Sequence, residues 1–329
     1  MRGQHKLGGV VAAVVLAALA TTTGAVDAKQ PPTTQVVKYD WKNGAEYDAK
    51  WAAPFGPGEG DRSVGTNQVT VDAAPFTTGA DLSVFDHLKY IRISAESFAV
   101  PESGSLEMSV QIDAETPGTE AGHVVDGCYG PSFSWDGAAP CVAPWSQVAF
   151  EGQQAGVVLN MINFQTGELF DWFVSSGRVF ALIERLPSAV TGSPDVVGLD
   201  KAYTQIIKEA PLARGGLHTV AIRYTRGGGE SFVEYFLDNK LFARVDDVGV
   251  PLDVQGVPYT GRAPSLGSGE VLSLDSFVIG HGLFSLLDAF PYQHPERPAL
   301  SVSIPLSERL FGQGAIGTWK NFKVTTRTN

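Results

Sequence analysis

The sequence is poor in cysteine, in methionine and in charge, with 2 Cys, 3 Met and 18% charged side chains in 329 residues. Two cysteines are too few for a disulfide-packed miniprotein, and a hydrophobic content of 43% is too high for a disordered chain. Lys and Arg number 24 against 35 Asp and Glu, with no basic run. A chain without a positive patch lacks the electrostatic footprint of a DNA- or RNA-binding protein.

The signature motifs of several enzyme classes are also missing. No Gly-x-Ser-x-Gly, His-Glu-x-x-His, Gly-x-x-x-x-Gly-Lys-Ser/Thr or dinucleotide fingerprint occurs. The glycine-rich runs at 56–60 and 227–229 lack the strand-to-helix context of a phosphate site, so we interpret them as turns.

No metal-ligand pattern is present either. His281, Asp288, Tyr292 and His294 are close in sequence, but their spacing fits no known metal site. A calcium ion would suit an acidic exported protein, yet no Asp-x-Asp-x-Asp run marks a site for it. We therefore expect neither a cofactor nor a metal.

A long apolar run occurs only at the N-terminus. Arg2 and Lys6 precede an apolar stretch from Leu7 to Ala20, and small residues follow up to Ala28. The stretch is too short to span a bilayer comfortably, and this layout is typical of an export signal covering residues 1–28. A retained membrane anchor is the alternative. We expect a secreted or cell-envelope protein that meets the membrane only during export.

The two cysteines, Cys128 and Cys141, are separated by twelve residues. In an oxidising compartment we expect them to form a disulfide, which stabilises a fold by roughly 3 kcal/mol for a loop of this size. With only His123 nearby, the two thiolates fall short of the four ligands that a structural zinc ion needs.

The chain after the export signal divides into two parts by composition. Residues 29–66 are rich in Pro, Gly, Asp and Lys with scattered aromatic residues, and we expect an irregular N-terminal lead-in. Residues 67–329 contain many short alternating runs that Gly and Pro separate, which favours a single all-β domain. The expected strands are Val69–Val71, His87–Ser94, Ser105–Ile112, Gly156–Phe164, Glu168–Val174, Arg178–Leu186, His218–Arg226, Glu230–Asp238, Lys240–Val245, Leu272–Gly280, Leu300–Ile304 and Thr318–Thr325.

Helix signals are few. Asp200–Glu209 is the best helix candidate, and Leu283–Leu287 could add one turn. The fold class that follows is a two-sheet antiparallel sandwich of the jelly-roll type, with long loops and at most one or two short helices.

The turn around Ser176-Gly177 sets a register for two neighbouring strands. If Ser175 faces Arg178, then Glu168 faces Arg185, and Asp171 becomes a diagonal neighbour of Glu184 on the other face. We expect Glu168 and Arg185 to form an ion pair.

Three segments carry a resemblance to a known family. His218–Tyr224, Phe232–Phe242 and Gly317–Val324 resemble the matching hairpin and closing strand of concanavalin A-like lectin and glucanase sandwiches. That resemblance implies a saccharide site on the concave sheet and its edge loops. The chain also resembles secreted actinobacterial proteins of a family without assigned function, through Asn160–Leu186 and Ile304–Gly314.

The candidate catalytic residues are Asp171, Glu184 and His218. The Glu-x-Asp-x-x-Glu motif of the glucanase branch is absent, because Glu168 and Asp171 point to opposite faces and no third carboxylate follows. Asp171 and Glu184 remain, with a diagonal placement that suits the roughly 5 to 9 Å of two-carboxylate glycoside chemistry. A solvated face, or pairing with an arginine, is the alternative. His218 faces Asp238, either as a held imidazole or as an ordinary strand-end pair.

The candidate ligand-binding residues are mostly aromatic. Trp135, Trp145 and Tyr129 belong to or flank the cysteine loop, where flat rings could stack on a sugar or pack into a core. Trp172 and Asn160 complete the set.

Three functions remain open from the sequence. The first is a secreted protein that binds a saccharide or similar extracellular ligand in a concave groove. The second is a carbohydrate-active enzyme, a glycoside hydrolase or lyase, or a cyclase, on the same scaffold. The third is a structural envelope protein. The oligomeric state is not indicated.

Overall fold

The computed structural model describes residues 32–78, 86–119, 123–129, 146–149, 154–195, 197–260, 265–286, 301–304 and 306–329. All of them belong to the unit that runs from Pro32 to Asn329. The expected export signal at 1–28 lies outside the described residues and stays a prediction.

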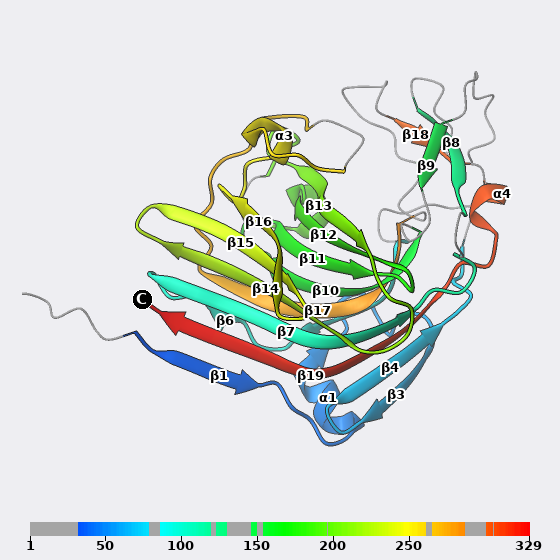
Figure 1. The fold of residues 1–329 in the computed structure, drawn as a ribbon, viewed down its shortest axis with the longest axis horizontal. Helices are drawn as coiled ribbons and strands as arrows, with labels where there is room; N and C mark the ends of the chain where they lie inside the picture. The colour runs from blue at the N-terminus through cyan, green and yellow to red at the C-terminus, as the bar shows by residue number, and fades with distance from the viewer. Residues whose placement is uncertain are drawn as a thin grey trace, which may run out of the picture. The chain divides into compact units, whose positions relative to one another are not determined.

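Most of the chain pairs into two large antiparallel sheets (Figure 1). The first sheet has the order β16-β15-β14-β7-β19-β4-β3, and β1 pairs with the C-terminal part of β19. Its strands are β1 (Thr34–Lys38), β3 (Asp61–Gly65), β4 (Gln68–Ala73), β7 (Gly104–Glu115), β14 (His218–Gly227), β15 (Glu230–Leu237), β16 (Lys240–Asp246) and β19 (Ala315–Thr328).

The second sheet has the order β13-β12-β11-β10-β17-β5-β2, and β6 pairs with β17. Its strands are β2 (Trp51–Ala52), β5 (Leu88–Ser94), β6 (Phe98–Ala99), β10 (Ala155–Asn163), β11 (Glu168–Val174), β12 (Arg178–Arg185), β13 (Tyr203–Pro211) and β17 (Ser276–Ser285). A third, small sheet joins β18 (Val302–Ser303), β8 (Val125–Tyr129) and β9 (Ser146–Ala149).

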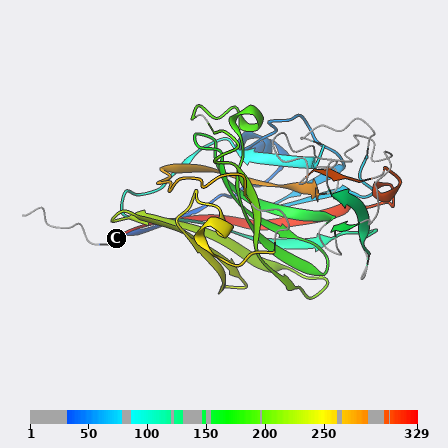
Figure 2. The ribbon, with the colours of Figure 1, turned by 90° about the horizontal axis from the view of Figure 1, so that it is seen from above.

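The two large sheets pack face to face over one hydrophobic core. Alternate residues of each strand point inward, so Phe170 and Trp172 of the second sheet meet Tyr224 and Tyr235 of the first. In Figure 2, β17 in orange and β19 in red lie in separate layers. The two-sheet antiparallel sandwich expected from the sequence is confirmed, and its strand order is that of a jelly roll.

Two predicted turns are present. β14 and β15 form a hairpin through the triple-glycine run, and β15 turns into β16 at Asp238 and Asn239. Both of these residues have a positive φ, 49° and 63°, which suits a two-residue turn of the primed type.

The two helix predictions are wrong. Residues 203–211 form β13 instead, because buried and exposed positions alternate from Tyr203 to Lys208 and the β-branched Thr204, Ile206 and Ile207 favour a strand. Residues 283–285 continue β17.

The lead-in is not irregular. It contributes β1, α1 (Gly44–Lys50), β2 and β3, and its aromatic residues Tyr39, Trp41, Tyr47 and Trp51 are buried in the core. The alternation that marks a strand is absent from this segment because single large rings, rather than a repeating face, are buried.

The other helices in the described chain are single turns: α2 (Ser188–Thr191), α3 (Leu252–Gln255) and α4 (Leu306–Arg309). One-turn helices leave no 3.6-residue periodicity, so the sequence gives no sign of them. None of the helices in the described ranges has the length and apolarity to cross a membrane.

Candidate functional site

The register predicted for β11 and β12 is the one observed. Ser175 N–H donates to the Arg178 carbonyl at 2.9 Å, Glu168 faces Arg185, and Asp171 faces Leu182. Because strand residues alternate in direction, Asp171 and Glu184 share the face of the second sheet that is turned away from the first. We call it the outer face. A small apolar cluster covers it: Val158, Phe173, Phe180 and Leu182.

The two carboxyl groups form a hydrogen-bonded pair. Asp171 is 5% exposed and Glu184 is half-buried, and a side-chain hydrogen bond joins them. Asn160 Nδ2, on β10, donates to Asp171 Oδ1 at 2.6 Å, and the Thr204 side chain on β13 donates to Glu184. Four adjacent strands therefore build the site.

Burial raises the pKa of Asp171 well above its usual value, and the charge of Glu184 raises it further. Burial also raises the pKa of Glu184, while its hydrogen bonds from Thr204 and Asp171 lower it. The pKa values of both carboxyl groups are therefore raised, and the two groups titrate as a coupled pair. No cation is among the described groups that shift either pKa.

The hydrogen bond between the carboxyl groups bears on the spacing expected from the sequence. Carboxyl groups that hydrogen-bond to each other lie about 3 Å apart, less than the roughly 5 to 9.5 Å of retaining or inverting glycosidases. The diagonal placement of Asp171 and Glu184 is confirmed, and the hydrogen bond between their carboxyl groups favours a contact closer than the glycosidase spacing. A pair this close holds one proton between two sites, as the carboxyl pair of aspartic peptidases does.

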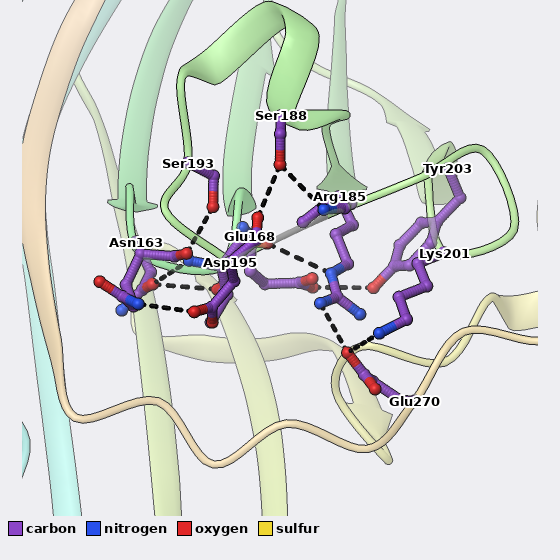
Figure 3. A network of polar contacts seen from close by, with 12 residues as sticks. Asn163, Glu168, Arg185, Ser188, Ser193, Asp195, Lys201, Tyr203 and Glu270 are labelled. Atoms are coloured by element: carbon purple, nitrogen blue, oxygen red, sulfur yellow. Dashed lines mark hydrogen bonds and ion pairs between the residues drawn. The ribbon is translucent and has the colours of Figure 1, made fainter.

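The predicted ion pair between Glu168 and Arg185 is also wrong, although the two residues face each other on the inner side of the sheet. Arg185 Nη2 pairs with Glu270 Oε1 at 2.9 Å and its Nε donates to the Thr166 carbonyl, while Tyr203 Oη donates to Glu168 Oε1 at 2.8 Å (Figure 3). Burial raises the pKa of Glu168 to about 8, against the lowering effects of Tyr203 and Arg185. A neutral carboxyl attracts a guanidinium only weakly, so the buried Arg185 pairs with Glu270 instead.

His218 lies away from this pair. It stands at the start of β14 in the first sheet, where its Nδ1 contacts Asp238 Oδ2 at 3.0 Å as expected. His281 lies on β17, buried between the sheets, with Nε2 in a 2.7 Å hydrogen bond to the Tyr47 hydroxyl. The other members of the His281 sequence group, Asp288, Tyr292 and His294, lie outside the described residues. Within the described part of the chain, no three His, Cys, Asp or Glu side chains form a metal site.

Trp172 is not a ligand-binding residue. It is fully buried between the sheets, where its indole N–H donates to the Ala221 carbonyl at 2.9 Å. Its odd-even position relative to Asp171 already places it on the inner face. Asn160 instead belongs to the site through Asp171.

The aromatic loop and the expected disulfide fall mostly outside the described residues. Trp135, Trp145 and Cys141 lie outside the described residues, and Cys128 and Tyr129 are described only as backbone of β8. These assignments stay predictions.

The sequence misses two members of the site. Thr204 belongs to the segment expected to be helical, and its alternation with Tyr203 and Gln205 is the signal that could have placed it on β13. Tyr235, on β15 of the first sheet, donates through its hydroxyl to the Leu182 carbonyl directly beneath the pair. A contact between two sheets leaves no trace in the local pattern.

Two hollows elsewhere on the described surface do not include the pair. One, of about 410 Å³, is lined by Glu59, Asp61, Asp72 and their neighbours. The other, of about 480 Å³, is lined by Glu115, Thr116, Ser176 and Arg214 among others.

Solved structures with a similar arrangement include enzymes and lectins. An endo-1,3-beta-glucanase from Streptomyces sioyaensis shares 9% identity over 90% of this chain and 97% of its own, with a TM-score of 0.40. Beta-agarase B from Zobellia galactanivorans shares 12% over 90% and 95%, with a TM-score of 0.42. Peanut lectin, in complex with a 9mer peptide, shares 10% over 90% and 99%, with a TM-score of 0.33. At these values we draw no functional conclusion from the similarities.

No curated protein matches the chain. A family model does match it, over residues 146–328, a range that begins with β9 and contains the four strands of the site. The chain therefore belongs to this group, described as a family of unknown function (DUF6081).

Proposed function

We propose that the protein is an acid–base enzyme that acts on a saccharide outside the cell, with the Asp171 and Glu184 pair as its proton-exchanging group. The observation that carries this proposal is the hydrogen bond between two carboxyl groups, with no described cation among the groups that shift their pKa values. We assign the role of acid to Asp171, because burial and the charge of Glu184 raise its pKa, and the role of base to Glu184, because the hydrogen bonds from Thr204 and Asp171 lower its pKa against the effect of burial. Two titratable groups whose surroundings separate their pKa values in this way suit the roles of acid and base.

The contact between the two carboxyl groups favours elimination over hydrolysis. Hydrolysis of a glycosidic bond needs carboxyl groups on opposite sides of the anomeric carbon, roughly 5 Å apart or more. Elimination on one face needs a base at a C–H and an acid at the leaving oxygen of the next carbon, and a hydrogen-bonded pair can reach both. The substrate we propose is a saccharide whose leaving oxygen is β to a carboxyl or carbonyl group, because that group makes the C–H acidic.

The proton balance of the step closes within the pair. Glu184 takes the proton from carbon, the C–O bond breaks as a C=C bond forms, and Asp171 gives its proton to the leaving oxygen. Glu184 then passes the captured proton to Asp171 across their hydrogen bond, which restores the starting state. The step draws on no cofactor.

Asn160 and Gly280 give the ligand a place beside the pair. Asn160 Oδ1 is buried and has no hydrogen-bond partner among the described residues, so it is an acceptor for a ligand hydroxyl. Gly280 faces Asn160 across β10 and β17, and a Cβ there would lie 3.3 Å from Asn160 Oδ1. These two features also favour a second candidate function, saccharide binding without turnover.

The test uses purified protein and a panel of polysaccharides with and without uronate units. We expect ultraviolet absorbance of an unsaturated product to rise with uronate polysaccharides. D171N and E184Q should each lower the rate by about 10² to 10⁴ and keep the fold, since they remove only a proton site. E230Q, an exposed carboxylate at the start of β15, is the control.

The other outcomes separate the candidates. New reducing ends without the absorbance would contradict elimination. Binding on a glycan array without any product, weakened by G280A, would establish the second function. An unchanged rate in D171N would show that the pair takes no part.

A further inference from the structure

Tyr235 reaches from the first sheet to the backbone beneath the carboxyl pair. The residue is fully buried, and its ring packs edge-on against Trp172 at 5.6 Å between centroids. Its hydroxyl donates to the Leu182 carbonyl, and a backbone hydrogen bond also joins the hydroxyl to Asp171. Asp171 and Leu182 face each other on β11 and β12, so one hydroxyl group contacts both strands at the site.

The contact coincides with an irregularity in the second sheet. The pairing of β12 with β13 shifts between Ala181 and Leu182, because Ile207 is an extra residue on β13 without a partner on β12. Bulges of this kind turn the side chains that follow them and are common next to active sites. Here the side chains after the shift are Glu184 and its partner Thr204.

We infer that Tyr235 is a positioning residue: through Leu182 and the Asp171 backbone, its hydroxyl fixes β12 against β11 beside the bulge, so that Glu184 stays in hydrogen-bond contact with Asp171. The inference rests on the proposed function of that pair. Without the hydroxyl, the Leu182 carbonyl loses a buried partner, and the two strands are free to separate at the site.

Tyr235 is suited to this task because it stays protonated. Burial raises its pKa well above the usual value, and the charges of Asp171, Glu168 and Glu184 raise it further. These three carboxyl groups are the titratable groups that shift the pKa of Tyr235, and no described cation is among them. The hydroxyl therefore donates its proton to a carbonyl at every pH at which the pair titrates.

The test is a titration of the side-chain carboxyl groups by carbon-13 NMR, without any ligand, in wild type, Y235F and Y224F. Tyr224 is the matched control, because its equally buried hydroxyl accepts from Leu274 N–H and does not contact the pair. We expect two apparent pKa values for the pair in wild type and Y224F. In Y235F the difference between the two apparent pKa values should fall by about one pH unit, because the coupling of the carboxyl groups weakens.

A Y235F titration identical to that of Y224F would overturn the inference. An unfolded Y235F would assign the residue to stability alone and overturn it equally. Because the titration needs no ligand, its result is independent of the polysaccharide assay. A smaller difference between the two apparent pKa values in Y235F, together with full activity of D171N, would overturn the proposed function. It would still support the positioning role of Tyr235.

Discussion

Glu168 shows how burial and pairing compete at a single residue. The side chain has no exposed surface, and only Tyr203 donates to it in the described chain, so one oxygen has no partner there. The desolvation penalty of a charged Glu168 at this buried position exceeds its favourable electrostatic interaction with Arg185, because the two side chains are not in direct contact. The group is therefore neutral at pH 7, with a pKa of about 8.

This pKa makes stability depend on pH in a stated direction. The folded protein keeps the Glu168 proton up to about pH 8, whereas the unfolded chain loses it near pH 4.5. The stabilisation is complete below the unfolded pKa and falls by up to about 1.4 kcal/mol per pH unit between these two values. E168Q should flatten this part of the curve, measured by urea unfolding at pH 5, 6, 7 and 8, with E230Q as the control. Equal slopes in wild type and E168Q would contradict the pKa of Glu168.

At the residue scale the sequence predicts the sheet face to which a side chain points, but not the residue that it contacts. The two-residue period places Asp171 and Glu184 on one face and Glu168 on the other, as observed. The period says nothing of the distance between the two carboxyl groups, which depends on Asn160, on Thr204 and on the bulge. The two-residue period also does not indicate that Arg185 pairs with Glu270, which is 85 residues away in sequence.

At the scale of elements, strands with a regular alternation are predictable and mixed segments are not. β11, β12, β14 and β15 have strong patterns and tight turns, and their pairing follows. β13 begins after Asp200 and Lys201, which mimic the start of a helix, and its strand character is decided by pairing with β12. Elements whose form depends on a partner far along the chain are those that the sequence misses.

β19 is central to the first sheet, because it pairs with β7 on one side and with β4 and β1 on the other. Deletion of residues 318–329 removes Trp319 and Phe322 from the core and exposes the edge of β7. We expect no soluble protein from this deletion, while removal of residues 328–329 alone should be tolerated. Soluble yield and circular dichroism are the measurements. A folded monomer after the longer deletion would contradict the central place of β19.

At the scale of the whole molecule, the N-terminal segment completes the sandwich rather than leading into it. Trp41 N–H donates to Asn67 Oδ1 at 2.9 Å and its indole N–H to the Gly65 carbonyl at 2.9 Å. Tyr47, on α1, reaches His281 on β17, and Trp51 packs against the same imidazole at 4.5 Å. The aromatic rings of residues 39–51 therefore complete the hydrophobic core between the two sheets.

Two N-terminal deletions test this arrangement. Removal of residues 1–28 leaves every described residue in place, so the melting temperature should match that of the full-length protein. Removal of residues 1–52 takes away the four buried rings of Tyr39, Trp41, Tyr47 and Trp51. Loss of one large buried ring costs about 3 to 5 kcal/mol, and a domain has about 5 to 15 kcal/mol of stability in all. The shorter protein should therefore fail to fold, measured by thermal unfolding and near-ultraviolet circular dichroism. A cooperative transition in the shorter protein would show that the sandwich closes without these rings, and that residues 32–52 are only attached to it.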